Sequence, residues 1–287
     1  SSYNNISSNI INNNRLVAID LDCSSNNYNI ISDNTIIDNN YAIDIDFSCC
    51  NTFSYNVIYD NSVGFSFDSS DGNNILFNDI QNSWNGIYIV ESDNNNIKGN
   101  DIKDCGFNGI YLLYSKNNVL KENSMENCGL LVFGSTLSEY INNVDTSNKI
   151  NGKILYYYIN KIGIEIPNNA GQVILINCDY CNVTNLDLCD GTIGVELAYS
   201  NNNIISKNKL NNNNFAGVYL ESSDENTVRG NKLENNGYGV TLQLADGNDI
   251  KNNDIITNNY GCYLYLSNSN ICFGNDISYC TYGLSLN

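Results

Sequence analysis

The pattern that decides the fold is clearest from Gly86 to Ile102, where the sequence reads GIYIVESDNNNIKGNDI. This stretch contains the motif N-x4-N-x-[ILM], which begins here at Asn95. Most copies are 22 or 23 residues apart, and a near-constant period of roughly 20 to 50 residues indicates a repeat architecture. The other copies begin at Asn4, Asn29, Asn51, Asn73, Asn118, Asn203, Asn226, Asn248 and Asn270.

Apolar residues recur at three positions of each repeat, which in the quoted copy are Ile87, Ile97 and Ile102. Around the first of them the sequence alternates between apolar and polar residues, as β-strands do. We therefore predict an all-β fold, a single-stranded right-handed parallel β-helix solenoid of about eleven coils with three short strands per coil. Identical side chains then stack along the solenoid, and the Asn columns are predicted to be inward amide ladders.

The period is interrupted once, between Asn118 and Asn203, which are 85 residues apart. We interpret this as one degenerate coil plus an insertion with extra strands at residues 134–177. The whole chain, residues 1–287, is then predicted to be a single β-helix domain.

Composition excludes several function classes. The net charge is −18 with only 13 Lys and Arg residues, which disfavours nucleic acid as a partner. The chain has no His, so histidine bases and imidazole-ligated metals are excluded. No apolar run is long enough to predict a membrane span. The 11 Cys residues favour an oxidising compartment, and we expect an extracellular or cell-surface protein, mature or excised since it starts at Ser1.

Aspartates on three consecutive coils form the best candidate site. They are expected to point outward from one sheet because they alternate with apolar residues. Three interpretations stay open, namely a solvated acidic face, a Ca²⁺ site, or acid and base groups of a glycosidase. No cofactor other than calcium is expected. The candidate ligands are Asp20, Asp22, Asp44, Asp46 and Asp68.

Several cysteines are candidates for disulfide bonds. Cys105 and Cys128 lie one coil apart, at a spacing that a disulfide can bridge. Cys178 and Cys181 form a C-x-x-C motif near Cys189, but no second motif or His completes a zinc site, so we favour disulfide bonds there.

Two further sets of residues are candidates for surface roles. Asn5 and Asn182 lie in N-x-[ST] sequons and are candidate glycosylation sites. Outward tyrosines either pack against one another across strands or form a contact surface for sugar or protein. These tyrosines are Tyr88, Tyr111, Tyr219 and Tyr263.

The repeat from Gly86 to Ile102 resembles the right-handed β-helix repeat of pectate-lyase-like proteins. It is most similar to periplasmic copper-binding proteins of nitrous oxide reductase maturation and to archaeal cell-surface proteins, whose inserts resemble residues 148–158 and 167–178. The resemblance implies the fold but little about activity. Lyases of this fold use Ca²⁺ and a basic residue, yet the arginines, Arg15 and Arg229, appear in no obvious basic cluster. Copper sites use His, Met or Cys, and Met125 is the single Met.

From these observations we predict a structural or adhesive protein of the cell surface that is not an enzyme. The alternatives are a polysaccharide lyase or hydrolase that uses the aspartates, or an accessory protein that binds copper or calcium. The expected partners are copies of the chain, surface carbohydrate or other envelope proteins.

Joining the last residues, 283–287, to the first, 1–6, gives a nearly normal repeat. We therefore expect that subunits can stack end to end into a filament.

Overall fold

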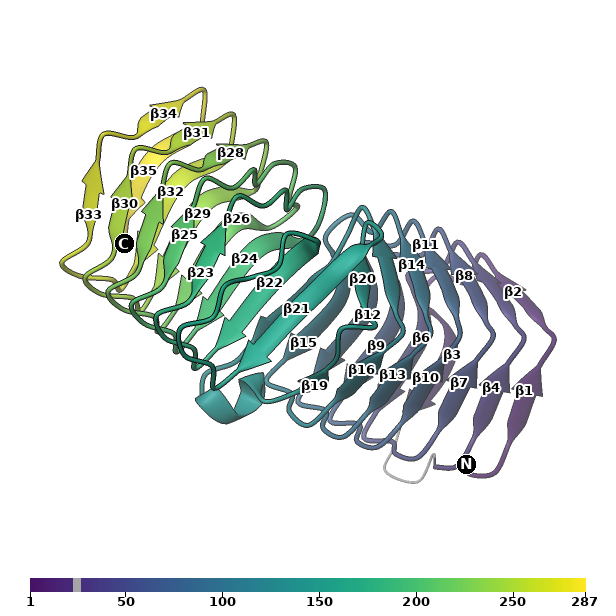
Figure 1. Cartoon of the computed structure of the whole chain (residues 1–287). Coiled ribbons are helices and arrows are strands. Elements are labelled where there is room, and N and C mark those ends of the chain that lie inside the picture. The colour runs from purple at the N-terminus through teal and green to yellow at the C-terminus, as the bar shows by residue number, and fades with distance from the viewer. Residues whose placement is uncertain (23–26) are drawn as a thin grey trace. The chain divides into compact units, whose positions relative to one another are not determined.

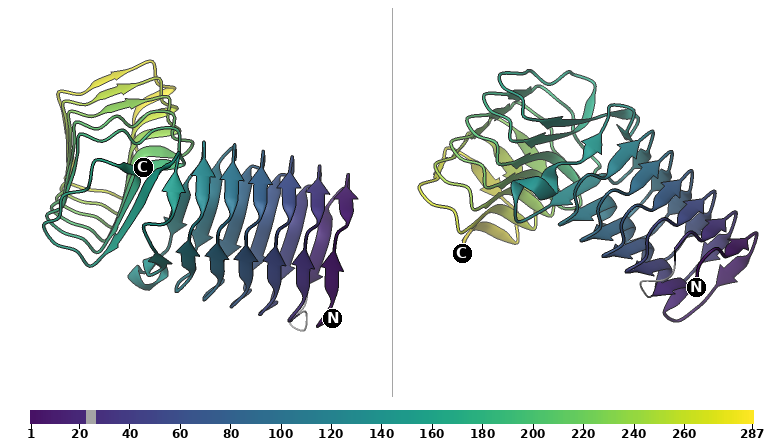
Figure 2. Two further views of the ribbon diagram at one scale, coloured as in Figure 1. Left: turned by 45° about the vertical axis from the view of Figure 1, so that its right-hand side comes forward. Right: turned by 90° about the horizontal axis from the view of Figure 1, so that it is seen from below.

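The computed structural model describes residues 1–22 and 27–287 and is built almost entirely of short parallel strands (Figure 1). The chain divides into two compact units, residues 1–149 and 150–287. Each unit is a parallel β-solenoid whose coils stack on one another (Figure 2). The predicted all-β solenoid is confirmed, whereas a single continuous domain stays a prediction.

The first unit has three parallel sheets, one for each strand position of the coil. The first sheet contains β1 (Asn5–Ser7), β4 (Ile30–Ser32), β7 (Thr52–Ser54), β10 (Asn74–Leu76), β13 (Asn96–Lys98), β16 (Val119–Lys121) and β19 (Asn143–Val144). The second contains β2 (Ile10–Asn12), β5 (Thr35–Ile37), β8 (Val57–Tyr59), β11 (Asp79–Gln81), β14 (Asp101–Lys103) and β17 (Ser124–Glu126). The third contains β3 (Val17–Asp22), β6 (Tyr41–Asp46), β9 (Val63–Asp68), β12 (Asn85–Val90), β15 (Asn108–Leu113) and β18 (Leu130–Phe133).

The second unit is built in the same way. Its long sheet contains β21 (Lys153–Ile159), β22 (Ala170–Ile176), β24 (Ile193–Ala198), β26 (Ala216–Glu221), β29 (Tyr238–Gln243), β32 (Tyr260–Tyr265) and β35 (Tyr282–Leu286). A second sheet contains β23 (Asn182–Thr184), β25 (Ile204–Ser206), β27 (Thr227–Arg229), β30 (Asp249–Lys251) and β33 (Ile271–Phe273). The third contains β28 (Lys232–Glu234), β31 (Asp254–Ile256) and β34 (Asp276–Ser278).

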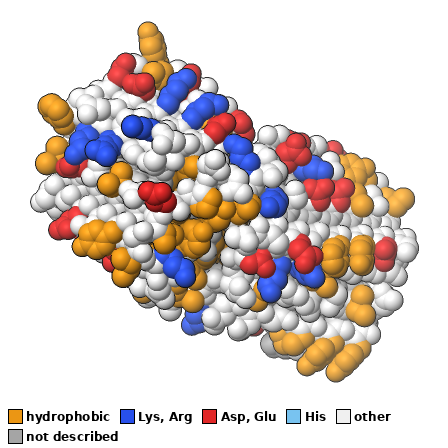
Figure 3. Space-filling view, in the orientation of Figure 1, with side chains coloured by type: hydrophobic (Ala, Val, Ile, Leu, Met, Phe, Trp, Pro, Cys, Tyr) orange, Lys and Arg blue, Asp and Glu red, His pale blue; other side chains and the backbone are white. Residues whose placement is uncertain are grey.

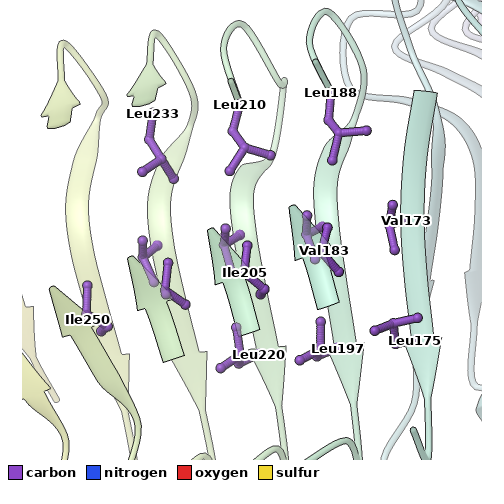
Figure 4. Packing of buried hydrophobic residues seen from close by; sticks show 14 of the residues in the cluster. Val173, Leu175, Val183, Leu188, Leu197, Ile205, Leu210, Leu220, Leu233 and Ile250 are labelled. Carbon is purple, nitrogen blue, oxygen red and sulfur yellow. The ribbon is translucent and has the colours of Figure 1, made fainter. Parts of the chain in front are cut away.

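The strands pair in register, so each repeat position forms a column. Ile75 pairs with Phe53 on the preceding coil and with Ile97 on the following one, and all three side chains are fully buried. The second unit has the same kind of core, in which one aliphatic side chain from each coil stacks on the next (Figure 4). The predicted apolar columns are therefore confirmed.

The Asn columns form the predicted amide ladders. Asn78 Oδ1 accepts hydrogen bonds from the backbone N–H and the Nδ2 of Asn56, both at 3.0 Å. Asn78 Nδ2 donates to Asn100 Oδ1 at 3.0 Å and to the Phe53 carbonyl at 3.1 Å. These bonds satisfy buried polar groups at the bends between strands, where regular sheet pairing is interrupted.

The residue before most ladder Asn residues has a positive φ, which turns the chain sharply into the next strand. Phe77 has φ 55° before Asn78, and Gly99 has φ 68° before Asn100. The Phe77 ring lies 2.4 Å from the place that a Cβ on Gly99 would occupy. Gly99 is thus needed for this close packing as well as for its backbone conformation.

Residues 134–177 contain extra strands, and their description as an insertion between coils stays a prediction. After the short 3₁₀ helix η1 (Leu137–Tyr140), β19 extends the first sheet of the first unit, and β21 and β22 begin the long sheet of the second. β20 (Lys149–Ile150) straddles the boundary between the units. The structure has about 13 turns where about eleven were predicted, because this segment supplies turns of its own.

Replacing a central ladder amide tests how strongly the ladder stabilises the fold. Asn78→Ala would leave the buried Asn56 N–H without its acceptor and would remove the side-chain bonds to Asn100 Oδ1 and the Phe53 carbonyl. We expect the free energy of unfolding to fall by about 3 kcal/mol. Urea denaturation measures this change. The exposed Asn40→Ala is the matched control and should change stability by less than about 0.5 kcal/mol. Equal effects of the two variants would contradict the ladder's stabilising role.

Candidate functional site

The five predicted aspartates lie on the third sheet of the first unit. Asp20 and Asp22 of β3 pair in register with Asp44 and Asp46 of β6. Asp46 in turn pairs with Asp68 of β9. The structure therefore brings the five aspartates together on one sheet, as the alternation predicted.

Burial and repulsion between neighbouring carboxylates act together in this group. Burial is the main cause that raises the pKa of Asp44, with Asp20 and Asp68 adding to it, while a hydrogen bond from Ser66 opposes the shift. The pKa of Asp46 is also raised, first by burial and then by Asp44 and its other acidic neighbours. Both pKa values are therefore raised mainly by burial, and the like charges of neighbouring carboxylates add to this effect.

The aspartates lie side by side on neighbouring strands. Among residues 1–22 and 27–287, no three His, Cys, Asp or Glu side chains are arranged to hold a metal ion. Calcium binding by the aspartates therefore stays a prediction.

A second surface, on the long sheet of the second unit, carries a column of aromatic rings. Tyr238, Tyr260 and Tyr282 begin consecutive strands and pair in register; we call them the tyrosine ladder. The ring centroids of Tyr238 and Tyr260 are 4.9 Å apart and those of Tyr260 and Tyr282 are 4.6 Å apart, each pair being within 14° of parallel. Such regular stacking follows directly from in-register coils.

Other aromatic and polar side chains surround the tyrosine ladder. The Tyr263 ring packs at 5.5 Å against both Tyr238 and Tyr260, at angles of 54° and 68°. Thr241, Tyr263 and Ser285 form a neighbouring column of the same sheet. Thr241 is buried, whereas Tyr263 and Ser285 are half-buried. Tyr282 is 53% exposed and the other two ladder rings are half-buried, so a partner can reach the ladder.

A buried pair of one tyrosine and one glutamate, which we call the acidic pair, lies on the same sheet, one strand before the ladder. The Tyr219 hydroxyl donates to Glu221 Oε2 at 2.6 Å, and the two residues are only 1% and 3% exposed. Burial raises the pKa of Glu221 from 4.5 to about 6, although hydrogen bonds from Tyr219 and Ser222 oppose this shift. Glu196, the register partner of Tyr219 on β24, is also fully buried.

Sequence reasoning placed Tyr219 and Tyr263 on an exposed outward face. Tyr263 is half-buried there, but Tyr219 is only 1% exposed, so the prediction is wrong for Tyr219. The burial of Glu196 and Glu221 was missed. In a strand that alternates apolar and polar residues, both glutamates occupy positions that the pattern assigns to solvent. The alternation gave no signal of their burial. The two-residue period of a strand shows which face of the sheet a side chain lies on, but not what packs on that face.

The predicted disulfide partners Cys105 and Cys128 are both buried. A hydrogen bond with the Cys128 thiol, followed by burial, raises the pKa of Cys105 well above its ordinary value. The structure thus brings the two residues into contact as thiols, and the disulfide bond stays a prediction.

Cys178 and Cys181 of the C-x-x-C motif and the nearby Cys189 do not meet at one point. Cys178 and Cys181 Sγ contact the carbonyls of Tyr158 and Lys161 at 3.4 and 3.9 Å. Cys189 instead accepts a hydrogen bond from the Asn211 N–H at 3.3 Å. Burial raises the pKa of both Cys178 and Cys189 to about 11, so both thiols stay protonated at neutral pH.

The two sequons lie in different surroundings. Asn5, in β1, is exposed, whereas Asn182, in β23, is half-buried and its N–H donates to the Ile164 carbonyl at 2.8 Å. Glycosylation at either residue stays a prediction.

The acidic pair predicts a pH dependence of stability. Because the folded chain holds the Glu221 proton more tightly than the unfolded chain, Glu221 favours folding below about pH 4.5 and this contribution is lost as the pH rises past about 6. Glu221→Gln removes the titration, so we expect the variant to gain on the order of 1 to 2 kcal/mol relative to wild type between pH 4 and 7. Melting curves measure this gain. The exposed Glu225→Gln should run parallel to wild type, and parallel curves for Glu221→Gln would contradict the prediction.

Mass mapping of unreduced protein tests the contact between Cys105 and Cys128. In an oxidising compartment we expect a disulfide-linked peptide pair that contains both residues. Alkylation in denaturant without reductant provides the check. Full labelling of both residues would show that the bridge does not form.

Comparison with known proteins places the chain in a family. The model of the periplasmic copper-binding protein (NosD) family matches residues 1–85 and 138–287, and that of the right handed beta helix region matches residues 64–170. No curated protein sequence matches closely enough to indicate a relative. Across the described residues, no helix reaches the length and hydropathy of a membrane span.

Solved structures with a similar fold include the A-module of the Azotobacter vinelandii mannuronan C-5 epimerase AlgE4, with 11% identity, TM-score 0.40 and coverage of 91% of this chain and 82% of that one. An alginate lyase from Paenibacillus sp. matches with 9% identity, TM-score 0.35 and coverage of 99% and 91%. The catalytic domain of a GH87 alpha-1,3-glucanase matches with 10% identity, TM-score 0.39 and coverage of 94% and 61%.

These structures correct one prediction. The statement that the chain is not an enzyme is wrong as a firm claim, because proteins with a similar fold act as an epimerase, a lyase and a glucanase. At these identities the likeness concerns the fold and assigns no reaction. The family match covers most of the sequence, and the chain belongs to the periplasmic copper-binding protein (NosD) family.

Proposed function

We propose that the chain is an adhesive β-solenoid of the cell envelope that binds an uncharged polysaccharide along the tyrosine ladder. The observation that carries the proposal is the column formed by Tyr238, Tyr260 and Tyr282, with ring centroids 4.6 to 4.9 Å apart. The periplasmic description of the family supports an envelope location.

The ladder's geometry favours an extended polymer. Stacked rings cover one another's faces, so their edges and hydroxyl groups are what a partner meets. One phenol per coil repeats at a distance close to the length of one sugar unit in an extended chain. A polysaccharide that runs along the solenoid axis would therefore meet an equivalent hydroxyl at each successive sugar.

The surroundings of the ladder favour hydrogen bonding to sugar hydroxyls. Gln243 and Ser285 lie half-buried on the same sheet and can both donate and accept hydrogen bonds. The net charge of −18 repels anionic polymers such as alginate. An uncharged glycan is therefore the partner of choice.

The copper in the family's description does not fit the residues present. The chain has no His, and Met125 is fully buried in a core column. Among the residues that the structure describes, no group of three candidate ligands is arranged around one point. Copper therefore has no part in the proposal, and end-to-end association of subunits stays a separate prediction.

Removing ladder hydroxyls tests the proposal. Tyr238→Phe with Tyr260→Phe keeps the stacked rings but loses two hydrogen-bonding groups, and we expect polysaccharide affinity to fall about tenfold. Affinity electrophoresis in gels that contain hydroxyethylcellulose or an α-1,3-glucan, with alginate as the anionic comparison, measures the change.

Tyr55→Phe is the matched control, because Tyr55 is also exposed and stacks on Phe77 at 5.4 Å in the first unit. It should bind as wild type does. Wild-type mobility unaffected by either uncharged glucan, or equal losses in the control and the double variant, would refute the proposal.

A further inference from the structure

A pocket of about 310 Å³ opens on the second unit, away from the long sheet that carries the tyrosine ladder. It lies where β25 and β27 end and the chain bends toward the next sheet. Figure 3 shows Lys and Arg side chains gathered over this part of the second unit, where Figure 1 places β25, β28 and β30. The residues that line the pocket are Ser206, Lys207, Arg229, Gly230 and Asn252.

The pocket exists because a glycine occupies one bend. Lys207, Gly230 and Asn252 follow equivalent strands on consecutive coils, and all three have positive φ. A Cβ on Gly230 would meet no atom within 4 Å, so the missing side chain leaves open space between Lys207 and Asn252. The Lys207 N–H donates to the Arg229 carbonyl at 3.2 Å, which fixes Arg229 beside the opening.

The two cations of the pocket lack acidic partners among the described residues. Seven Lys residues there form ion pairs, and neither Lys207 nor Arg229 takes part in one. The register partner of Arg229, Lys251, is bound to Asp249 at 2.7 Å. The chain as a whole has a net charge of −18. The pocket is locally positive instead, because its two cations have no carboxylate paired with them among the described residues.

The sequence-based interpretation of Arg229 is therefore corrected. It predicted that Arg229 lies away from any basic cluster, but Arg229 and Lys207 line the same pocket. They are 22 positions apart in the chain, so only the stacking of coils brings them together.

We propose that this pocket binds a single oxyanion group, a carboxylate, sulfate or phosphate, carried by a small molecule or by a sugar unit. The Arg229 guanidinium supplies a planar pair of N–H donors that suits two oxygens of one anion. Lys207 adds a second positive charge, and the Asn252 amide can donate from the far side of the Gly230 gap. The volume lies near the lower end of the range for small-molecule sites.

Isothermal titration calorimetry at low ionic strength tests the site with sodium sulfate, phosphate and galacturonate as separate probes. We expect saturable binding of at least one probe, and the one bound most tightly identifies the oxyanion. Lys207→Gln with Arg229→Gln should weaken that binding at least tenfold.

Two further variants separate the site from general charge effects. Gly230→Asn fills the gap without changing charge at a positive-φ position that Asn tolerates, and it should weaken binding as the double variant does. Lys121→Gln removes one positive charge from the first unit and should bind as wild type does. Circular dichroism confirms that each variant is folded.

Two outcomes would overturn the proposal. One is the absence of saturable binding of all three probes, and the other is unchanged affinity in the folded double variant. Because the tyrosine ladder lies on another sheet and binds an uncharged glycan, failure of one proposal leaves the other intact.

Discussion

The rest of the structure depends on the pairing of buried Asn amides between neighbouring coils. Strands of three residues, such as β10 and β11, form few backbone hydrogen bonds, and the bend between them leaves polar groups inside the solenoid. One amide per bend, such as that of Asn78, bonds to the coils on both sides. The same bonds set the vertical alignment of the coils, since a shift of one residue would break all of them.

Because the register is fixed, every surface of the molecule is a set of columns. A residue type that recurs at one repeat position becomes a continuous feature in space, as the aspartates of β3 and β6 and the tyrosine ladder show. A residue that differs from the others of its column changes the surface only locally. Gly230 does this, because its missing side chain opens a pocket. Both proposed binding sites arise in this way, one from repetition and one from an exception.

The features that repeat were predictable from the sequence, whereas those that depend on single side chains were not. The spacing of Asn73, Asn95 and their equivalents predicts the coil, the core columns and the outward aspartates. The burial of Glu221 could not be foreseen, because it depends on what packs above the strand. The meeting of Lys207 and Arg229 required knowledge of which bends lie next to each other. The copy of the motif from Asn143 to Ile150 was overlooked, and residues 151–177 contain no copy, so the turns of this segment were not recognised.

The identical bonding of successive coils has a consequence for how the gene of such a chain can change over generations. Each coil bonds to its neighbours through the same few groups, so duplication of 22 codons, the step between Asn56 and Asn78, would add a coil that meets matching partners on both sides. Length can thus vary in whole coils while existing columns keep their alignment. An insertion of a few codons would instead be accommodated only where it bulges out at a bend. Gene lengths in such a lineage should therefore differ mainly by multiples of one repeat.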